Sequence, residues 1–112
     1  MIALARQPYR YPQKMKNKKG IKLGVAWYRE DQWELLKSTA SDRENIEDTY
    51  HEWLQHAEEG IKKLKNQGLR PARVDLNVKE FNDWCEREGR IPDAGSRSEY
   101  TAELLRRRDK DK

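Results

Sequence analysis

Apolar residues recur at regular spacings along this 112-residue chain, and these spacings predict a series of strands and helices. In residues 21–29, apolar side chains occupy every second position from Ile21 to Trp27. The positions between them include Gly24 and Ala26. This alternation predicts a strand with one apolar face and one face of small residues, against which another element can pack closely.

Two helices are expected after this strand. Residues 30–38 have acidic residues in the first turn, which favour a helix start, and their apolar set is Trp33, Leu35 and Leu36. Residues 41–68 form the clearest helical pattern, because apolar residues follow one another at spacings of three and four. Ser41 and Glu44 have the spacing of a capping box at its start, and Gly68 is a natural stop. The apolar residues of this stripe are Ile46, Tyr50, Trp53, Leu54, Ala57, Ile61 and Leu64.

The second half of the chain repeats the order of strand and two helices. Residues 72–77 are predicted to form a short strand, followed by helices over 78–88 and 97–107. Asn77 and Ser96 each precede a glutamate by three residues, the spacing of a helix N-cap and its partner. We therefore expect a helix-rich α+β domain of order β-α-α-β-α-α. Its two-stranded sheet, whose direction stays open, is marginal alone. Edge pairing in a homodimer is one way to complete such a sheet.

The composition is consistent with one highly charged domain. Charged residues make up 39% and hydrophobic ones 35%, and the length suits a single domain. We expect a flexible basic arm over 1–20, a folded domain over 21–108 and a charged tail over 109–112. The single cysteine, Cys85, excludes an internal disulfide, and its place in a helical pattern predicts a buried, inert thiol. No apolar run has the length of a membrane span, so we predict a cytoplasmic protein without a membrane partner.

The net charge of +4 has its origin in the arm. The arm carries no acidic residue, and its basic residues alternate with Tyr9 and Tyr11. Basic side chains neutralise phosphates and tyrosines stack on unpaired bases. The arm is therefore predicted to contact RNA or DNA, and the alternative is a solubilising arm without a partner. The basic residues concerned are Arg6, Arg10, Lys14, Lys16, Lys18 and Lys19.

The last two predicted helices have the element order of a DNA-reading helix-turn-helix. Arg97 lies at the start of helix 97–107, where base or phosphate contacts would arise, so it joins the predicted nucleic-acid set. The predicted loop before it is longer than the three or four residues typical of that motif. The alternative is that helix 97–107 completes the core, with the arginines at 106–108 favouring the negative end of the helix.

Metal and catalytic motifs are weak in this sequence. His51 and His56 are five residues apart, whereas a helical zinc motif needs a spacing of four. Asp48, Glu52 and His56 follow one edge of a helix and have ligand types suited to a divalent ion, but a solvated charged edge is the alternative. No catalytic constellation was found, so neither an enzyme nor a cofactor is predicted.

Two functions follow from these observations. The first is a non-catalytic module that binds nucleic acid through its arm. The alternative is a protein-interaction or oligomer-forming module, which uses an exposed strand edge and an aromatic surface around Trp27, Tyr28 and Trp33.

Two blocks of the chain resemble a known group of sequences. The blocks are "GVAWYREDQWELLKS" and "DTYHEWLQHAEEGIKKLKNQGL". They are similar to small uncharacterised bacterial proteins that pair a "WYREDQW" strand–helix start with a long "EEW" helix. The resemblance covers residues 21–107. It implies a single domain and adds no site or activity.

Overall fold

A computed structural model describes residues 20–110 of the protein, and its elements follow the expected order β-α-α-β-α-α. The first half contains strand β1 (Lys22–Trp27), helix α1 (Trp33–Thr39) and the long helix α2 (Tyr50–Asn66). Short 3-10 turns, η1 (Glu30–Gln32) and η2 (Arg43–Asn45), precede the two helices. The second half contains strand β2 (Arg70–Asp75) and helices α3 (Val78–Glu88) and α4 (Ala94–Lys110). The α+β class is therefore confirmed.

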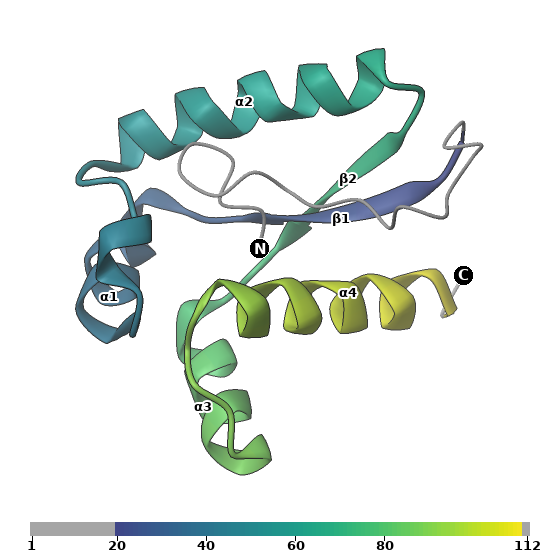
Figure 1. The fold of residues 1–112 in the computed structure, drawn as a ribbon. Coiled ribbons are helices and arrows are strands. Elements are labelled where there is room, and N and C mark those ends of the chain that lie inside the picture. Colours follow the sequence, from purple (N-terminus) through teal and green to yellow (C-terminus); the bar gives the residue numbers. More distant parts are fainter. Residues whose placement is uncertain (1–19, 111–112) are drawn as a thin grey trace.

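The two strands form a parallel sheet that lies between two helices (Figure 1). Lys22 is paired with Arg70, and the register continues to Trp27 beside Asp75. Helix α2 covers one face of the sheet and α4 covers the other (Figure 1). A parallel pair needs a long crossover between its strands, and here the segment that contains α1 and α2 provides it.

The two faces of β1 differ as the alternation predicts. Val25 packs with Ile61 and Leu64 of α2 in one apolar cluster, against which Leu23 also packs. On the other face, a Cβ atom added to Gly24 would lie 3.2 Å from Cγ2 of Thr101 in α4. The small face of the strand therefore lets α4 lie close to the sheet.

Aromatic rings form the centre of the main core. The ring of Trp53 in α2 lies 5.2 Å from those of Trp27 and Tyr28, measured between centroids, and 5.6 Å from that of Trp33. Tyr28 and Trp33 are 1% and 2% exposed. The expectation of an aromatic surface around Trp27, Tyr28 and Trp33 is therefore wrong, because Tyr28 and Trp33 are buried and Trp27 is only half-exposed.

Helix α2 begins nine residues later than the sequence pattern predicts. Its capping box consists of Thr49 and Glu52. The side chain of each residue accepts a hydrogen bond from the backbone N–H of the other. The predicted box of Ser41 and Glu44 is wrong, because residues 43–45 form η2 instead. The carboxylate of Asp42 accepts bonds from Arg97 and from the backbone N–H of Ala94. These bonds hold Asp42 against the start of α4, ahead of the short 3-10 helix η2 and outside α2.

The other boundaries are close to expectation. Helix α3 spans the predicted 78–88, and the side chain of Asn77 accepts the N–H of Glu80 as predicted. Helix α4 begins at Ala94 rather than at 97, and its first turn is capped by Asp93, whose Oδ1 accepts the N–H of Ser96. The predicted cap by Ser96 is therefore wrong. Strand β2 begins two residues earlier than predicted.

Candidate nucleic-acid interface

One end of the described domain gathers most of its basic side chains. This basic end comprises residues 20–23, 61–73 and 103–110, which hold ten lysine and arginine residues against two acidic residues. It consists of the start of β1, the segment from the end of α2 into β2, and the end of α4, which lie on the same side of the domain (Figure 1). The basic residues are Lys22, Lys62, Lys63, Lys65, Arg70, Arg73, Arg106, Arg107, Arg108 and Lys110.

Specific contacts join these segments. The ammonium of Lys22 in β1 lies 2.9 Å from the carboxylate of Asp109 in α4. Arg108 donates to the backbone oxygen of Arg73 in β2 at 3.1 Å. The guanidinium of Arg73 lies over the ring of Trp27, 4.4 Å from its centroid. Except for Lys22, which is half-buried, the basic side chains of this end are exposed.

The remainder of the described chain is acidic. Residues 24–60 and 74–102 hold seventeen acidic residues against seven basic ones. This separation is hidden when the charges after the arm are added together, because the total over residues 21–112 is close to neutral. Residues 61–73 contain five basic residues and no acidic one, and this local count was the signal that could have been found.

The segment 1–19 joins the domain at the basic end. The backbone N–H of Gly20 donates to the oxygen of Gly68 at 2.7 Å, beside the start of β2. Eight of the predicted nucleic-acid residues, six basic residues and two tyrosines, precede this point and lie outside the described residues. They are Arg6, Tyr9, Arg10, Tyr11, Lys14, Lys16, Lys18 and Lys19.

Arg97 lies in the interior and not at the interface. Its side chain is fully buried, and its two terminal nitrogens donate to the two carboxylate oxygens of Asp42 at 3.0 and 2.7 Å. The prediction that Arg97 contacts nucleic acid is therefore wrong, because the guanidinium is paired inside the domain. From the sequence, Arg97 looked like a surface residue because its partner is 55 positions away in the chain.

The buried pair changes the ionisation of the groups around it. Burial raises the pKa of Asp42, but the hydrogen bond and charge of Arg97 outweigh this effect, so the pKa is below its ordinary value of 3.8. Tyr28 lies in the field of both residues, and burial raises the pKa of its hydroxyl well above 10.0. Asp42 and Tyr28 therefore each keep one ionisation state across the neutral range, which is typical of a structural cluster.

A second carboxylate lies in the same region. Glu47 is 3% exposed, and its Oε2 lies 3.1 Å from Nδ1 of the half-exposed His56. Oε1 of Glu47 and Nε of Arg97 are buried without a hydrogen-bond partner. The cluster links the loop before α2 to α4 through Asp42 and Arg97.

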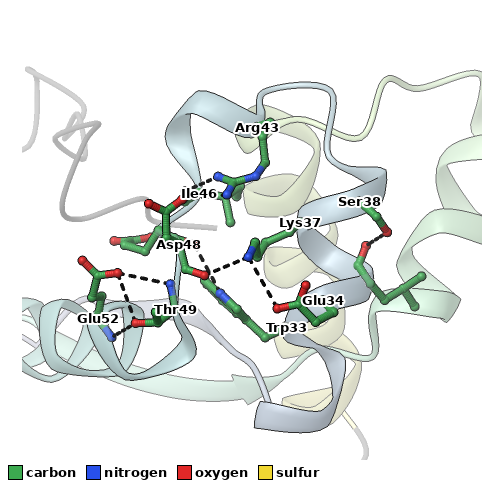
Figure 2. A network of polar contacts seen from close by, with 11 residues as sticks. Trp33, Glu34, Lys37, Ser38, Arg43, Ile46, Asp48, Thr49 and Glu52 are labelled. Carbon is green, nitrogen blue, oxygen red and sulfur yellow. Dashed lines mark hydrogen bonds and ion pairs between the residues drawn. The ribbon is translucent and has the colours of Figure 1, made fainter.

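The residues of the suggested metal edge have other partners. Asp48 accepts a bond from Arg43 at 2.7 Å, and Glu52 forms the capping box with Thr49 (Figure 2). His56 lies against Glu47. Within residues 20–110, no group of three or more histidine, cysteine or acidic side chains is arranged to hold a metal ion. The structure therefore does not bring Asp48, Glu52 and His56 together as ligands.

Cys85 is buried in α3, as expected. Burial is the main cause that raises the pKa of its thiol. A raised pKa lowers the fraction of thiolate, which is the reactive form. The buried position therefore gives no support to a thiol-based reaction at this residue.

Comparison with known proteins gives a family without an assigned activity. None of the helices within residues 20–110 is long and apolar enough to cross a membrane. Searches among curated proteins and among solved structures gave no match. A family described as a domain of unknown function (DUF8829) matches residues 16–110, which include the whole basic end. The chain therefore belongs to this family of domains of unknown function.

Proposed function

We propose that the basic end, together with the basic residues that precede it, binds the phosphate backbone of a nucleic acid. The separation of charge within the domain supports this proposal, since the domain as a whole carries a small excess of acidic residues. Phosphate contacts by lysine and arginine release counterions and provide most of the affinity of non-specific binding. The chain before Gly20 is joined to the domain at this end, and its six basic residues would add phosphate contacts to those of the basic end.

The described surface offers phosphate contacts rather than base contacts. Trp84 and Tyr100 are buried and pack against Phe81, and Trp27 lies beneath Arg73. Base stacking requires an accessible ring, and Tyr9 and Tyr11 in the preceding segment are the expected source. We therefore expect binding by the domain to depend strongly on salt and weakly on sequence.

The proposal is tested by two charge-matched variants of the full chain. K63Q/K65Q removes two exposed charges from the basic end, and K79Q/R87Q removes two exposed charges from α3. Binding to labelled single- and double-stranded oligonucleotides would be followed by fluorescence anisotropy at several salt concentrations. For duplex DNA, K63Q/K65Q should reduce the slope of log K against log salt by roughly 2, because each phosphate contact contributes about 0.9.

The control variant separates a local interface from an effect of total charge. K79Q/R87Q should bind like the wild type, since both of its changes lie in the acidic part of the domain. Neutralising the six basic residues before Gly20 to glutamine should reduce the slope by about 5. Equal losses in K63Q/K65Q and K79Q/R87Q, or no binding by the wild type near physiological salt, would contradict the proposal.

A further inference from the structure

Two arginines of the described domain lie over tryptophan rings, and their surroundings differ. The guanidinium of Arg90 lies 5.2 Å from the ring centroid of Trp84, and that of Arg73 lies 4.4 Å from the centroid of Trp27. The two terminal nitrogens of Arg90 donate to the two carboxylate oxygens of Glu99, one of them at 2.7 Å. Within residues 20–110, no oxygen accepts a hydrogen bond from the side chain of Arg73. Only the first of these two pairs therefore has an anionic partner in the described chain.

Contacts within the core fix the ring beneath Arg73. In the register of the sheet, Trp27 and Arg73 are diagonal neighbours on one face. The ring of Trp27 also packs against that of Trp53 in α2, at 5.2 Å between centroids. A cation over the face of an indole is attracted by the ring. The guanidinium of Arg73 is therefore held in place before a ligand binds.

The acidic residue nearest to Arg73 in the sequence is already paired. Asp75 accepts two hydrogen bonds from Arg29, at 3.2 and 2.9 Å. Residues 61–73 contain no acidic residue, and the backbone oxygen of Arg73 accepts a bond from a further cation, Arg108. The side chain of Arg73 thus lies in a positively charged region, where the binding of an anion is favoured.

We propose that Arg73 binds one phosphate of the nucleic-acid backbone through two parallel hydrogen bonds, and that Trp27 is the residue that positions it. The planar fork of arginine donors matches two oxygens of a phosphate, as it matches the two oxygens of Glu99 at Arg90. This role of Arg73 rests on the proposed function and gives the basic end a defined anchor.

The position of Arg73 adds affinity beyond its charge. An exposed arginine loses side-chain entropy when a ligand orders it, and preorganisation removes part of this cost. Lys62, Lys63 and Lys65 carry compact charges on flexible stems, and within residues 20–110 their side chains form no hydrogen bond or ion pair. The lysines therefore attract the ligand, whereas Arg73 fixes where its backbone passes beside β2.

The proposal is tested with variants of the full chain that keep its charge. Arg73→Lys removes the fork of donors, so the affinity for labelled duplex DNA in fluorescence anisotropy should fall about tenfold. The slope of log K against log salt should stay that of the wild type, because the charge is kept. Arg70→Lys makes the same change at an exposed arginine of the same segment that lies over no described ring, and it should bind like the wild type.

The role of Trp27 is tested by a double-mutant cycle and by NMR. Trp27→Leu should weaken binding, and combined with Arg73→Lys it should cost less than the sum of the single changes, because both disturb one contact. In the wild type, the side-chain Nε–H signal of Arg73, identified by its loss in Arg73→Lys, should shift when duplex DNA is added. The corresponding signal of Arg90 should not shift, since Glu99 occupies its donors.

The outcomes separate the role of Arg73 from the proposed function. If the wild type binds, unchanged binding by Arg73→Lys, equal losses in Arg73→Lys and Arg70→Lys, or an unshifted Arg73 signal would overturn the role of Arg73 alone. Additive losses in the cycle would overturn the positioning role of Trp27. No binding by the wild type near physiological salt would overturn both the anchor and the proposed function.

Discussion

The two ends of α4 use arginine in opposite ways. Near the start of the helix, Arg97 is fully buried and binds Asp42 through two hydrogen bonds. Near its end, Arg106, Arg107 and Arg108 are exposed and belong to the basic end. The first arginine joins two parts of the core, and the other three provide charge at the surface. The same residue type in one helix therefore serves stability at one end and a proposed ligand at the other.

The energetic consequences of this difference should be large. Loss of one partner of a buried ion pair strongly destabilises the fold, because the other partner is left charged and desolvated. An exposed arginine keeps its hydration, so its loss changes the free energy of unfolding only slightly. Substitutions at the two ends should therefore separate effects on folding from effects on binding.

The largest effect is expected for Arg97→Met. This change leaves the carboxylate of Asp42 without its main partner and should lower the free energy of unfolding by about 3–5 kcal/mol. Urea denaturation followed by circular dichroism measures the effect. Asp42→Leu combined with Arg97→Met should cost less than the sum of the single changes, because no unpaired charge is then buried. Additive losses would show that the pair is not coupled.

A larger side chain at Gly24, which faces the middle of α4, should lower the stability of the domain. Gly24→Val adds side-chain atoms where a Cβ alone would lie 3.2 Å from Thr101 and 3.4 Å from Leu105. Overpacking of this kind costs about 1–3 kcal/mol, which thermal unfolding would detect. The control is Gly95→Ala in the exposed first turn of α4, where the nearest atom is 3.6 Å away. It should stabilise the helix by about 0.5–1 kcal/mol.

A smaller loss in the free energy of unfolding is expected when acid protonates Asp42. The pKa of Asp42 in the folded protein is below its ordinary value of 3.8, which we take for the unfolded state. At a pH between these two pKa values, the unfolded state therefore binds more protons than the folded state. The contribution of Asp42 is thus present above pH 3.8 and is lost as the pH falls through its folded pKa. Urea midpoints between neutral and acidic pH should fall less steeply in Asp42→Asn than in the wild type. Parallel pH profiles would contradict this assignment.

The smallest effect on stability is expected at the exposed end of α4. Arg107→Gln removes a charge that pairs with Glu103 at 3.1 Å on the helix surface. The free energy of unfolding should change by no more than about 0.5 kcal/mol. In anisotropy measurements the same variant should bind duplex DNA with a reduced salt slope, by about 0.9. A loss of stability close to that of Arg97→Met would remove the distinction between the two ends.

The sequence predicts those features that depend on neighbouring residues. The alternation in β1, the cap by Asn77 and the span of α3 are all local, and the structure confirms them. The spacing of Ser41 and Glu44 is also local, but the predicted capping box does not form. Asp42 between them instead binds Arg97 of α4. The direction of the sheet and the burial of Arg97 depend on residues far apart in the chain, so no short-range pattern contains them.

The candidate site likewise depends on contacts between residues far apart in the chain, which short-range patterns do not contain. The charges of the basic end can be counted from the sequence, but their convergence requires three segments to meet through Lys22, Arg73, Arg108 and Asp109. The contact of the segment before Gly20 with nucleic acid stays a prediction, since its residues lie outside those described. An interface composed of element ends is therefore hard to recognise until the topology is known.

The parallel pairing of β1 and β2 has a consequence for the order of folding. Gly24 lies beside Ala72, so every bond of the sheet closes a loop that includes α1 and α2. The entropy of closing such a loop opposes pairing until other contacts offset it. Helices α2 and α3, with their local caps, can form earlier, and the docking of α2 shortens the distance that the strands must close. The sheet at the centre of the domain is thus expected to be among the last parts to assemble, and contacts across it should form late in refolding.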